Sequence, residues 1–429
     1  MFANIKQIFS PKNKDLRKRI LFTLFVLIIF KAGTAITVPG TQSLTKDLGF
    51  LDLWNAMSGG ALESFSIFAL GVGPYINASI ITQLLQMDII PYFSDLKNQG
   101  AVGRRKINQI TRYLGIALAF IQGYIFSFAF VADGTPVEYM SFAIILTAGT
   151  ALLLWIGDQI TAKGIGNGIS IVLTINIISR IPSDLTKLYE QFMSGKTIPK
   201  AILAGIIIAA IIVALVVFVV ILQSAERRIP VQYSNKIQGR RQVGGNSSVI
   251  PMKVNTAGVI PVIFAQSLLQ TPIMLVQLFD KDGVSGFWGK VLNTMNQSNW
   301  FNPGNWVYSI GAIVYILLII GFAYFYTEIT FNPLEIAENL KRSGGFIPGI
   351  RPGKPTSDYL TSILKNVIFI GAIGLAVVAL LPIVFNGLLG ASVSFGGTSI
   401  IIIVGVIVET LKQVESQMMV RNYKGFLND

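Results

Sequence analysis

The sequence contains many apolar stretches, each long enough to cross the hydrocarbon core of a lipid bilayer. About 20 residues of helix cover the required ~30 Å, and clear examples lie at 20–38, 202–222, 306–326 and 367–384. Hydropathy gives about ten such stretches. Because 52% of the 429 residues are hydrophobic and only 13% are charged, we expect an all-α polytopic membrane protein rather than a soluble one.

The residue types that are missing narrow the chemistry further. The chain has no cysteine and no histidine, which excludes disulfides and thiolate chemistry and removes the commonest general base and metal ligand. We also find no Walker A motif, and the glycines of GIGNGIS at 164–170 lack the strand before them that a nucleotide-binding loop requires. We therefore expect no enzymatic activity, no metal and no cofactor, and we expect this glycine-rich stretch to form a tight turn.

The basic residues predict how the chain is oriented. They gather in four groups, at 6–19, 97–106, 227–253 and 341–354, whereas few lie between the groups. An even number of crossings places all four groups on one side, together with both termini, and the positive-inside rule assigns that side to the cytosol. The net charge of +13 is thus explained by topology, without a nucleic-acid partner.

The expected organisation has ten spans in two halves. The spans lie at 20–38, 53–90 (interrupted), 110–130, 141–160, 167–187, 200–223, 255–278, 306–327, 361–387 and 396–412. Residues 1–196 and 197–429 would each supply five helices, as in transport proteins with internal repeats. Two cytosolic loops, 223–254 and 327–359, are predicted to be ordered because they lack the composition of flexible linkers.

The second span is broken in the middle. In GGALESFSIFALGVGPYINASIITQLLQ at 59–86, Gly71, Gly73 and Pro74 interrupt the apolar run. The thirteen residues 75–87 would form a helix of roughly 20 Å, too short to cross the membrane, and residues 53–69 are too polar to face lipid. Two interpretations remain open: a Gly/Pro kink in one helix, or a segment that folds back inside the bundle.

The charges within the spans bear on the type of transport. Coupled transporters need ionisable groups in the membrane, and Lys31, Asp158 and Glu409 lie toward span ends, where long side chains can reach water. We expect the span interiors to be almost free of charge. A channel is therefore favoured over the alternative, a secondary transporter of a small solute.

Several long motifs resemble the SecY family, the pore subunits of the bacterial protein-conducting translocon. They are the 59–86 segment, GRRKINQITRY at 103–113, GIGNGIS at 164–170, ERRIPVQY at 226–233, VNTAGVIPVIF at 254–264, FIPGIRPG at 346–353 and FGGTSI at 395–400. The resemblance implies two pseudo-symmetric five-helix halves around an hourglass pore in the cytoplasmic membrane. Unfolded polypeptides would cross through the pore, and apolar segments would leave sideways into lipid.

The resemblance also implies three sets of site residues within the membrane. Residues 52–66 would form a plug, with Asn55, Ser58, Gly59, Gly60, Ala61, Leu62 and Ser64 among its members. The aliphatic pore ring would be Ile76, Ile80, Ile169, Leu173, Ile263 and Ile402. The lateral gate, between the 75–87 helix and the span from about 254, would include Thr82, Gln83, Gln270 and Thr271. A lone isoleucine more often faces lipid or packs, and the polar gate residues fit helix–helix hydrogen bonding equally well.

The partners implied by the resemblance are other proteins and the membrane. Arg240, Arg241 and Arg351 match basic positions that contact the ribosome and the SecA motor ATPase. Small membrane subunits, SecE and a SecG-like protein, signal sequences with their precursor polypeptides, and the lipid bilayer complete the set. Most cytosolic arginines need no partner, because topology explains them. Arg351 differs because the prolines and glycines around it should fix its direction.

Overall fold

The structure is a computed structural model of the 429-residue chain. It describes residues 14–39, 55, 58–62, 64–86, 90–130, 134–194, 198–233, 236–238, 241–243, 247–279, 286–302, 304, 306–389 and 397–425. A helix lies at each of the ten predicted spans. These helices are α2 (Lys14–Thr34), α4 (Gly73–Leu85), α6 (Gly100–Phe130), α7 (Pro136–Lys163), α8 (Gly168–Phe192), α9 (Ile198–Ser224), α10 (Ile260–Phe279), α12 (Ile310–Thr330), α14 (Lys354–Leu389) and α15 (Gly397–Gly425).

Six regions of the described chain are helical, long and apolar enough to cross a membrane. They lie at 100–127, 136–163, 168–192, 202–224, 306–342 and 354–387. Several helices run beyond the predicted spans, because hydropathy marks only the part that lies in lipid, whereas a helix continues into water wherever packing supports it. The prediction of a multi-pass helical membrane protein is confirmed.

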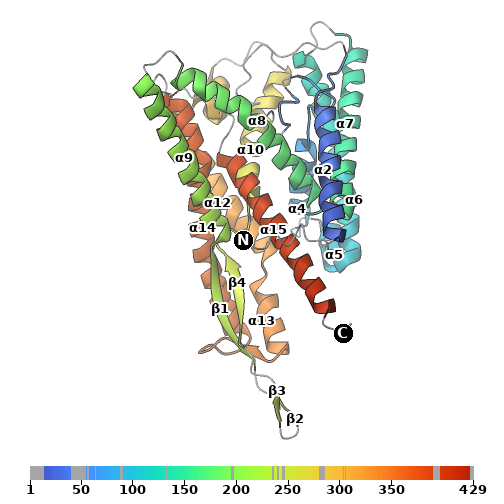
Figure 1. Ribbon diagram of the computed structural model, residues 1–429, viewed down its shortest axis with the longest axis vertical. Coiled ribbons are helices and arrows are strands. Elements are labelled where there is room, and N and C mark those ends of the chain that lie inside the picture. Colours follow the sequence, from blue (N-terminus) through green and yellow to red (C-terminus); the bar gives the residue numbers. More distant parts are fainter. Residues whose placement is uncertain are drawn as a thin grey trace.

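Strands form outside the predicted spans and were not foreseen. β1 (Glu226–Tyr233) pairs antiparallel with β4 (Ser247–Lys253) and, at its far end, with β5 (Gly345–Phe346), which gives the sheet order β4-β1-β5. The short pair β2 (Lys236–Gln238) and β3 (Arg241–Val243) extends this hairpin. In Figure 1, β1, β4 and α13 (Pro333–Arg342) lie beside the lower part of α14, and β2 and β3 reach beyond the helices at that end. The parts of the two predicted cytosolic loops that the structure describes are therefore ordered.

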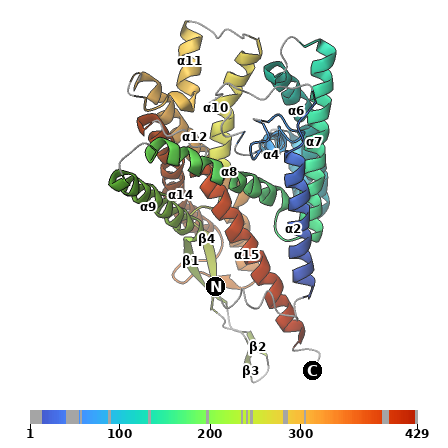
Figure 2. The same ribbon diagram turned by 45° about the horizontal axis from the view of Figure 1, so that its top comes forward.

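Further short helices lie at the ends of the bundle. α5 (Pro91–Asn98) leads into α6 at the end that carries the strands, whereas α11 (Phe287–Met295) stands at the opposite end in Figure 2. Two 3-10 turns, η2 (Gln297–Asn299) and η3 (Trp306–Ser309), connect α11 to α12.

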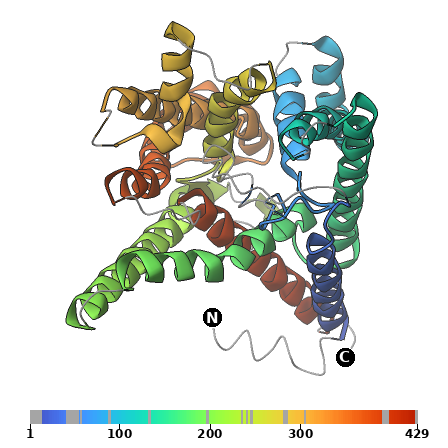
Figure 3. The ribbon, with the colours of Figure 1, turned by 90° about the horizontal axis from the view of Figure 1, so that it is seen from above.

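The large hydrophobic cores each lie within one half of the chain, whereas a small cluster of Leu16, Ile165 and Val414 joins the two halves. One large core joins α9, α10, α12, α14 and α15 through side chains such as Val219, Val262 and Ile401. Two others join α2, α6, α7 and α8 with residues of the 61–72 segment. Viewed from above, the blue-to-teal helices of the first half and the yellow-to-orange helices of the second form two groups, and α8 and α15 run along one side (Figure 3).

The segment before α4 is buried although it is not helical. Residues 58–62 and 64–72 form successive turns, and Ser58, Phe65 and Phe68 are only 2%, 0% and 3% exposed. This segment pairs with the chain that follows α2, because the Val38 N–H donates to the Phe65 carbonyl at 3.0 Å and the Ile67 N–H donates to the Ile36 carbonyl at 3.0 Å. The prediction of a segment inside the bundle is confirmed, and the interpretation as one kinked helix is wrong.

The short helix α4 has the predicted length of thirteen residues, shifted by two positions. It begins at Gly73 because Pro74 fits the first turn of a helix, where no backbone N–H is needed. Gly71, at φ 56°, makes the left-handed bend that separates the turns from the helix.

Candidate pore and its closing segment

The six aliphatic residues predicted to form a pore ring are all buried or half-buried. By contrast, isoleucines on the outer surface, such as Ile28 and Ile206, are 69% and 64% exposed. Three of the six come together, because Ile76 and Ile169 pack against the cluster that contains Leu173. Ile80, Ile263 and Ile402 lie outside this cluster, and Ile402 is 4% exposed.

Part of the predicted plug packs against the same cluster. Ala61, which is 1% exposed, belongs to it, whereas Leu62 belongs to the neighbouring cluster with Phe65. The turn is held internally, since the Asn55 carbonyl accepts from the Gly60 N–H at 2.9 Å and from Ser58 Oγ at 3.0 Å. Ser64 Oγ donates back to the Gly60 carbonyl at 3.3 Å. All seven named plug residues lie within the described part of the chain.

Two charged residues lie inside α8, which corrects the expectation that the span interiors are almost uncharged. Arg180 is 8% exposed and Asp184 is 3% exposed, and both fall within the predicted fifth span. They were missed because hydropathy averaged over α8 remains high enough for a membrane span. The i, i+4 spacing of opposite charges was the available signal, since it places both side chains on one helix face.

The polar residues predicted for the lateral gate bond within their own helices. Thr82 Oγ1 donates to the Ala78 carbonyl at 2.7 Å, Gln83 Nε2 donates to Ser79 Oγ at 3.1 Å, and Thr271 Oγ1 donates to the Ser267 carbonyl at 2.7 Å. Gln270 is 7% exposed on α10. For Thr82, Gln83 and Thr271, these bonds are not the helix–helix bonds considered as the alternative role.

The α4 gate residues face a cavity that α4 shares with α6. This cavity of about 250 Å³ is lined by Thr82, Gln83 and Gln86 of α4 together with Asn108 and Thr111 of α6, among others. The structure thus brings Thr82 and Gln83 next to α6, whereas Gln270 and Thr271 lie on α10. Sequence reasoning had placed all four at one seam between α4 and α10.

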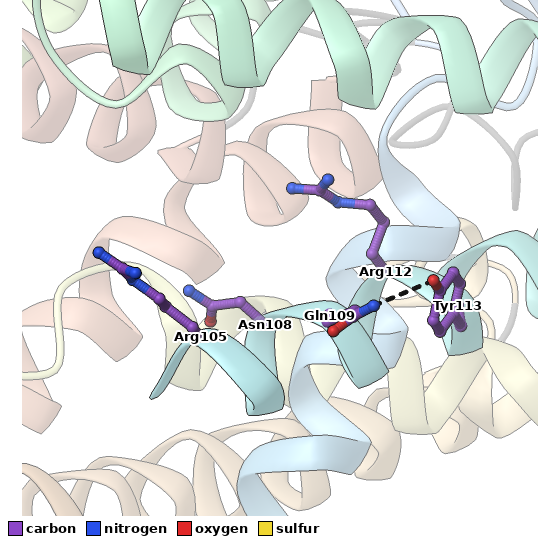
Figure 4. A pocket seen from close by; sticks show the side chains of 5 residues that line it. All are labelled: Arg105, Asn108, Gln109, Arg112 and Tyr113. Atoms are coloured by element: carbon purple, nitrogen blue, oxygen red, sulfur yellow. Dashed lines mark hydrogen bonds between the residues drawn. The ribbon is translucent and has the colours of Figure 1, made fainter. Parts of the chain in front are cut away.

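A second cavity of about 440 Å³ lies along the first turns of α6. Figure 4 shows the five residues that line it, Arg105, Asn108, Gln109, Arg112 and Tyr113, and the bond from Gln109 Nε2 to the Tyr113 hydroxyl at 3.1 Å. Arg112 Nη2 also forms an ion pair with Asp158 Oδ2 of α7 at 2.6 Å. Asp158 is therefore paired across two helices.

Of the three arginines predicted to bind partners, the structure describes the side chain of Arg351. Arg351 is exposed between Gly349 and Gly353, which have φ of 82° and 103°, and its carbonyl accepts from Thr356 Oγ1 at 2.8 Å. This bend holds the backbone at Arg351, as the surrounding residues predicted. Arg240 lies outside the described residues, and of Arg241 the structure describes the backbone alone, at the start of β3.

The glycine-rich stretch between α7 and α8 is a turn, as predicted. The side chain of Asn167 caps α8 by accepting from the Ile169 and Ser170 N–H groups at 3.2 and 3.4 Å. Gly166, at φ 77°, makes the reversal possible. The turn thus sets the start of α8, and Ile169 and Leu173 lie near that start.

These observations define a multi-pass helical membrane protein with a non-helical segment folded between its helices. Comparison with known proteins identifies its family. A family model described as SecY matches residues 66–411. The chain is 45% identical to the protein translocase subunit SecY of Halalkalibacterium halodurans over 100% of both chains, and 44% identical to that of Bacillus subtilis over 97% of each. The chain belongs to the SecY family.

Solved structures share the fold. A structure described as that of a protein conducting channel matches with a TM-score of 0.65 and 20% identity, covering 94% of this chain and 93% of the other. Sec61 in the canine ribosome-channel complex from the endoplasmic reticulum matches with a TM-score of 0.62 and 18% identity over 94% and 93%. These relatives are channel or translocase subunits, so the small-solute transporter alternative finds no support.

Proposed function

We propose that the chain is the pore subunit of a channel that passes unfolded polypeptides across the cytoplasmic membrane of a bacterium and releases apolar segments sideways into lipid. One observation carries the proposal: Ala61 of the folded-back segment packs with Leu173, Ile76 and Ile169 in a single apolar cluster. A narrow aliphatic constriction excludes water and ions when no chain fills it. A segment resting against that constriction would add a second seal.

The architecture in this proposal has two five-helix halves, 1–196 and 197–429, around an hourglass pore. Support comes from the separate cores, since the large second-half core draws on residues 215–404 and the two large first-half cores draw on residues 27–173. Most of the packing within each half would therefore persist if the distance between the halves changed, although the small cluster of Leu16, Ile165 and Val414 bridges them. Such a change would open the lateral gate, and Thr82, Gln83, Gln270 and Thr271 are the polar residues we assign to it.

The orientation and partners are part of the same proposal. Both termini and the end that carries β1, β4 and α13 would face the cytosol, where SecA and the ribosome bind. SecE and a SecG-like protein would accompany the chain as small membrane subunits. The exposed Arg351 guanidinium suits phosphate and carboxylate groups. One solved structure with the same fold is that of Sec61 in a ribosome-channel complex.

Reconstitution tests the function directly. The chain would be placed in vesicles with SecE, a SecG-like subunit, SecA and a secretory precursor, and protection of the precursor from added protease would be measured. We expect protection that depends on ATP. Complete absence of protection, with the channel folded and the motor active, would overturn the proposal.

The variant Ile402→Asn tests the pore ring. An amide in a dry aliphatic constriction gives water a hydrogen-bonding partner, so we expect ion leak to rise by about tenfold, as a barrier lowered by 1.4 kcal/mol would produce. Precursors with defective signals should also be admitted. Ile407→Asn is the matched control on the same helix, because Ile407 is 47% exposed. Equal leak in the two variants would remove Ile402 from the ring.

The variant Arg351→Glu tests partner binding. Reversing this charge should slow SecA-driven export severalfold, because an anion repels the carboxylate or phosphate groups that the arginine would bind. Insertion of the channel into the membrane should remain normal. Arg342→Glu is a matched reversal on α13, where the Arg342 side chain is 79% exposed. Export at the normal rate with Arg351→Glu would refute the contact.

A further inference from the structure

The turn at residues 58–62 rests on two polar side chains of α8. A Cβ atom built on Gly59 would lie 2.7 Å from Asn176 Oδ1, and one built on Gly60 would lie 3.9 Å from Arg180 Nη1. Both glycines have positive φ, 70° and 85°, a conformation that other residues rarely adopt. The bare backbone of this turn therefore lies directly against α8, and at Gly59 a methyl group does not fit.

The contact surface on α8 is a continuous, buried polar face. Asn176, Arg180 and Asp184 follow one another at i, i+4 spacing, so they share one side of the helix, and they are 0%, 8% and 3% exposed. Leu173 of the predicted ring is 7% exposed and lies seven residues before Arg180, which is about 10 Å along the helix axis. The buried face thus changes from aliphatic at the constriction to polar beneath the turn.

A polar face of this kind is costly at membrane depth unless it has a role. Charged side chains within membrane spans are expensive and mark functional positions, and close packing of α8 could be achieved with apolar residues alone. Apolar surfaces resist separation because water must then cover them. A polar surface is hydrated when its cover leaves, so a segment seated on it can be displaced and can return.

We propose that Asn176 and Arg180 form the seat of the plug, and that they position the Gly59–Gly60 turn over the pore in the closed channel. This inference rests on the proposed channel function and adds the residues that set how firmly the channel closes. Asn176 fixes the turn by fitting the space that Gly59 leaves open. Arg180 covers Gly60 from the next helical turn.

Because the chain has no cysteine, one introduced thiol can report displacement of the plug. Ala61→Cys introduces a single thiol at a position that is 1% exposed. The channel with this one change is the parent, and every variant below carries the change as well. A membrane-impermeant maleimide, added on the extracytoplasmic side, labels the thiol when the plug leaves its seat. The labelling rate therefore reports plug displacement without requiring translocation.

Two substitutions should loosen the seat. With Gly59→Ala or Arg180→Ala we expect labelling about tenfold faster than in the parent, the size of effect given by the loss of one buried contact. Arg180→Lys, which keeps the charge, should lie between Arg180→Ala and the parent. Ile178→Ala is the control on the exposed side of α8, where Ile178 is 39% exposed, and it should label like the parent.

A double variant separates the contact from backbone strain. Asn176→Ala removes the Oδ1 atom that the new methyl group meets, so Gly59→Ala should accelerate labelling by a smaller factor in an Asn176→Ala background than in the parent. Gly344→Ala is the strain control, since Gly344 has φ 72° and nothing within 4 Å of its Cβ position. An equal acceleration by Gly59→Ala in both backgrounds, or rates that do not respond to Arg180→Ala and Arg180→Lys, would overturn the seat.

Translocation by the Ala61→Cys parent distinguishes this inference from the proposed function. If the parent protects a precursor in the reconstituted assay but the labelling rate is the same in all seat variants, the proposed seat is refuted and the channel function is not. If the parent does not protect the precursor although the unsubstituted chain does, Val72→Cys, at a position 1% exposed in the same cluster, replaces it as the reporter. If the unsubstituted chain does not protect the precursor, the channel function fails, and the seat fails with it.

Discussion

The two halves of this protein build their interiors differently. In the second half, five helices meet in one core, and Trp300 closes it at one end with its indole N–H donating to the Thr294 carbonyl at 2.7 Å. In the first half, Ala61, Phe68 and Val72 of the turn-rich segment fill the space among α2, α7 and α8. One core is thus made mainly by helices, whereas the other depends on a segment of turns.

This difference indicates which part of the molecule can move. A segment of turns has fewer repeating backbone hydrogen bonds than a helix, so it can open locally at a free energy below that of global unfolding. Displacing it would leave the helices of the first half in place while a passage opens. In the second half, the described core residues lie mainly on helices, with Trp300 and Phe301 in a short turn.

Trp300→Ala should have the largest effect on stability. Trp300 is fully buried and lies 5.6 Å from the Tyr315 ring between centroids, so we expect a loss of about 3–5 kcal/mol. Thermal unfolding of the purified protein in detergent measures it. Trp288→Ala is the control, because Trp288 is 67% exposed. Similar melting temperatures for the two variants would contradict a tightly packed second half.

Leu62→Ala should have a smaller and more local effect. Leu62 is 2% exposed in the first-half core, and truncating it removes about 2–4 kcal/mol of packing from the turn-rich segment. Because that segment can open by itself, ion leak should rise, whereas the melting temperature should fall less than with Trp300→Ala. Leu203→Ala, at a site 61% exposed on α9, should change neither. A large drop in melting temperature without any leak would break the comparison.

Removing the Arg112–Asp158 ion pair should have the smallest effect. Its side chains are 47% and 37% exposed, and pairs with such access to solvent contribute about 0.2–1 kcal/mol. A double-mutant cycle with Arg112→Ala and Asp158→Asn, followed by thermal unfolding, gives the coupling directly. A coupling far above this range would mean that the pair, rather than apolar packing, holds α6 against α7.

Local patterns in the sequence predicted much of the fold. Hydropathy located ten helices, and the mixture of Gly, Pro and small polar residues in 53–74 indicated a segment that cannot face lipid. The thirteen-residue length of α4 followed from its distance to the break. These features depend on neighbouring residues, which is why reading along the chain was sufficient.

Other features were missed because they depend on distant partners. Strand β1 shows only two buried alternating residues, Ile229 and Val231, and it forms because β4 pairs with it about twenty residues later. Thr82 and Gln83 were predicted for a seam with α10, and nothing in the sequence indicated that they also line a cavity with residues of α6. The burial of Arg180 could not be seen until α8 was packed against the turn.

Sequence alone established that this chain spans a membrane, where its basic residues gather, and which regions of it are helical, because transfer free energies and backbone preferences act residue by residue. Tertiary structure alone decided that a run of turns is enclosed among helices and that a charged face of α8 lies under two glycines. Whether a segment is enclosed depends on which surfaces pack together in three dimensions. The free energy of burying a charge or a glycine backbone depends on the side chains that contact it from distant parts of the sequence.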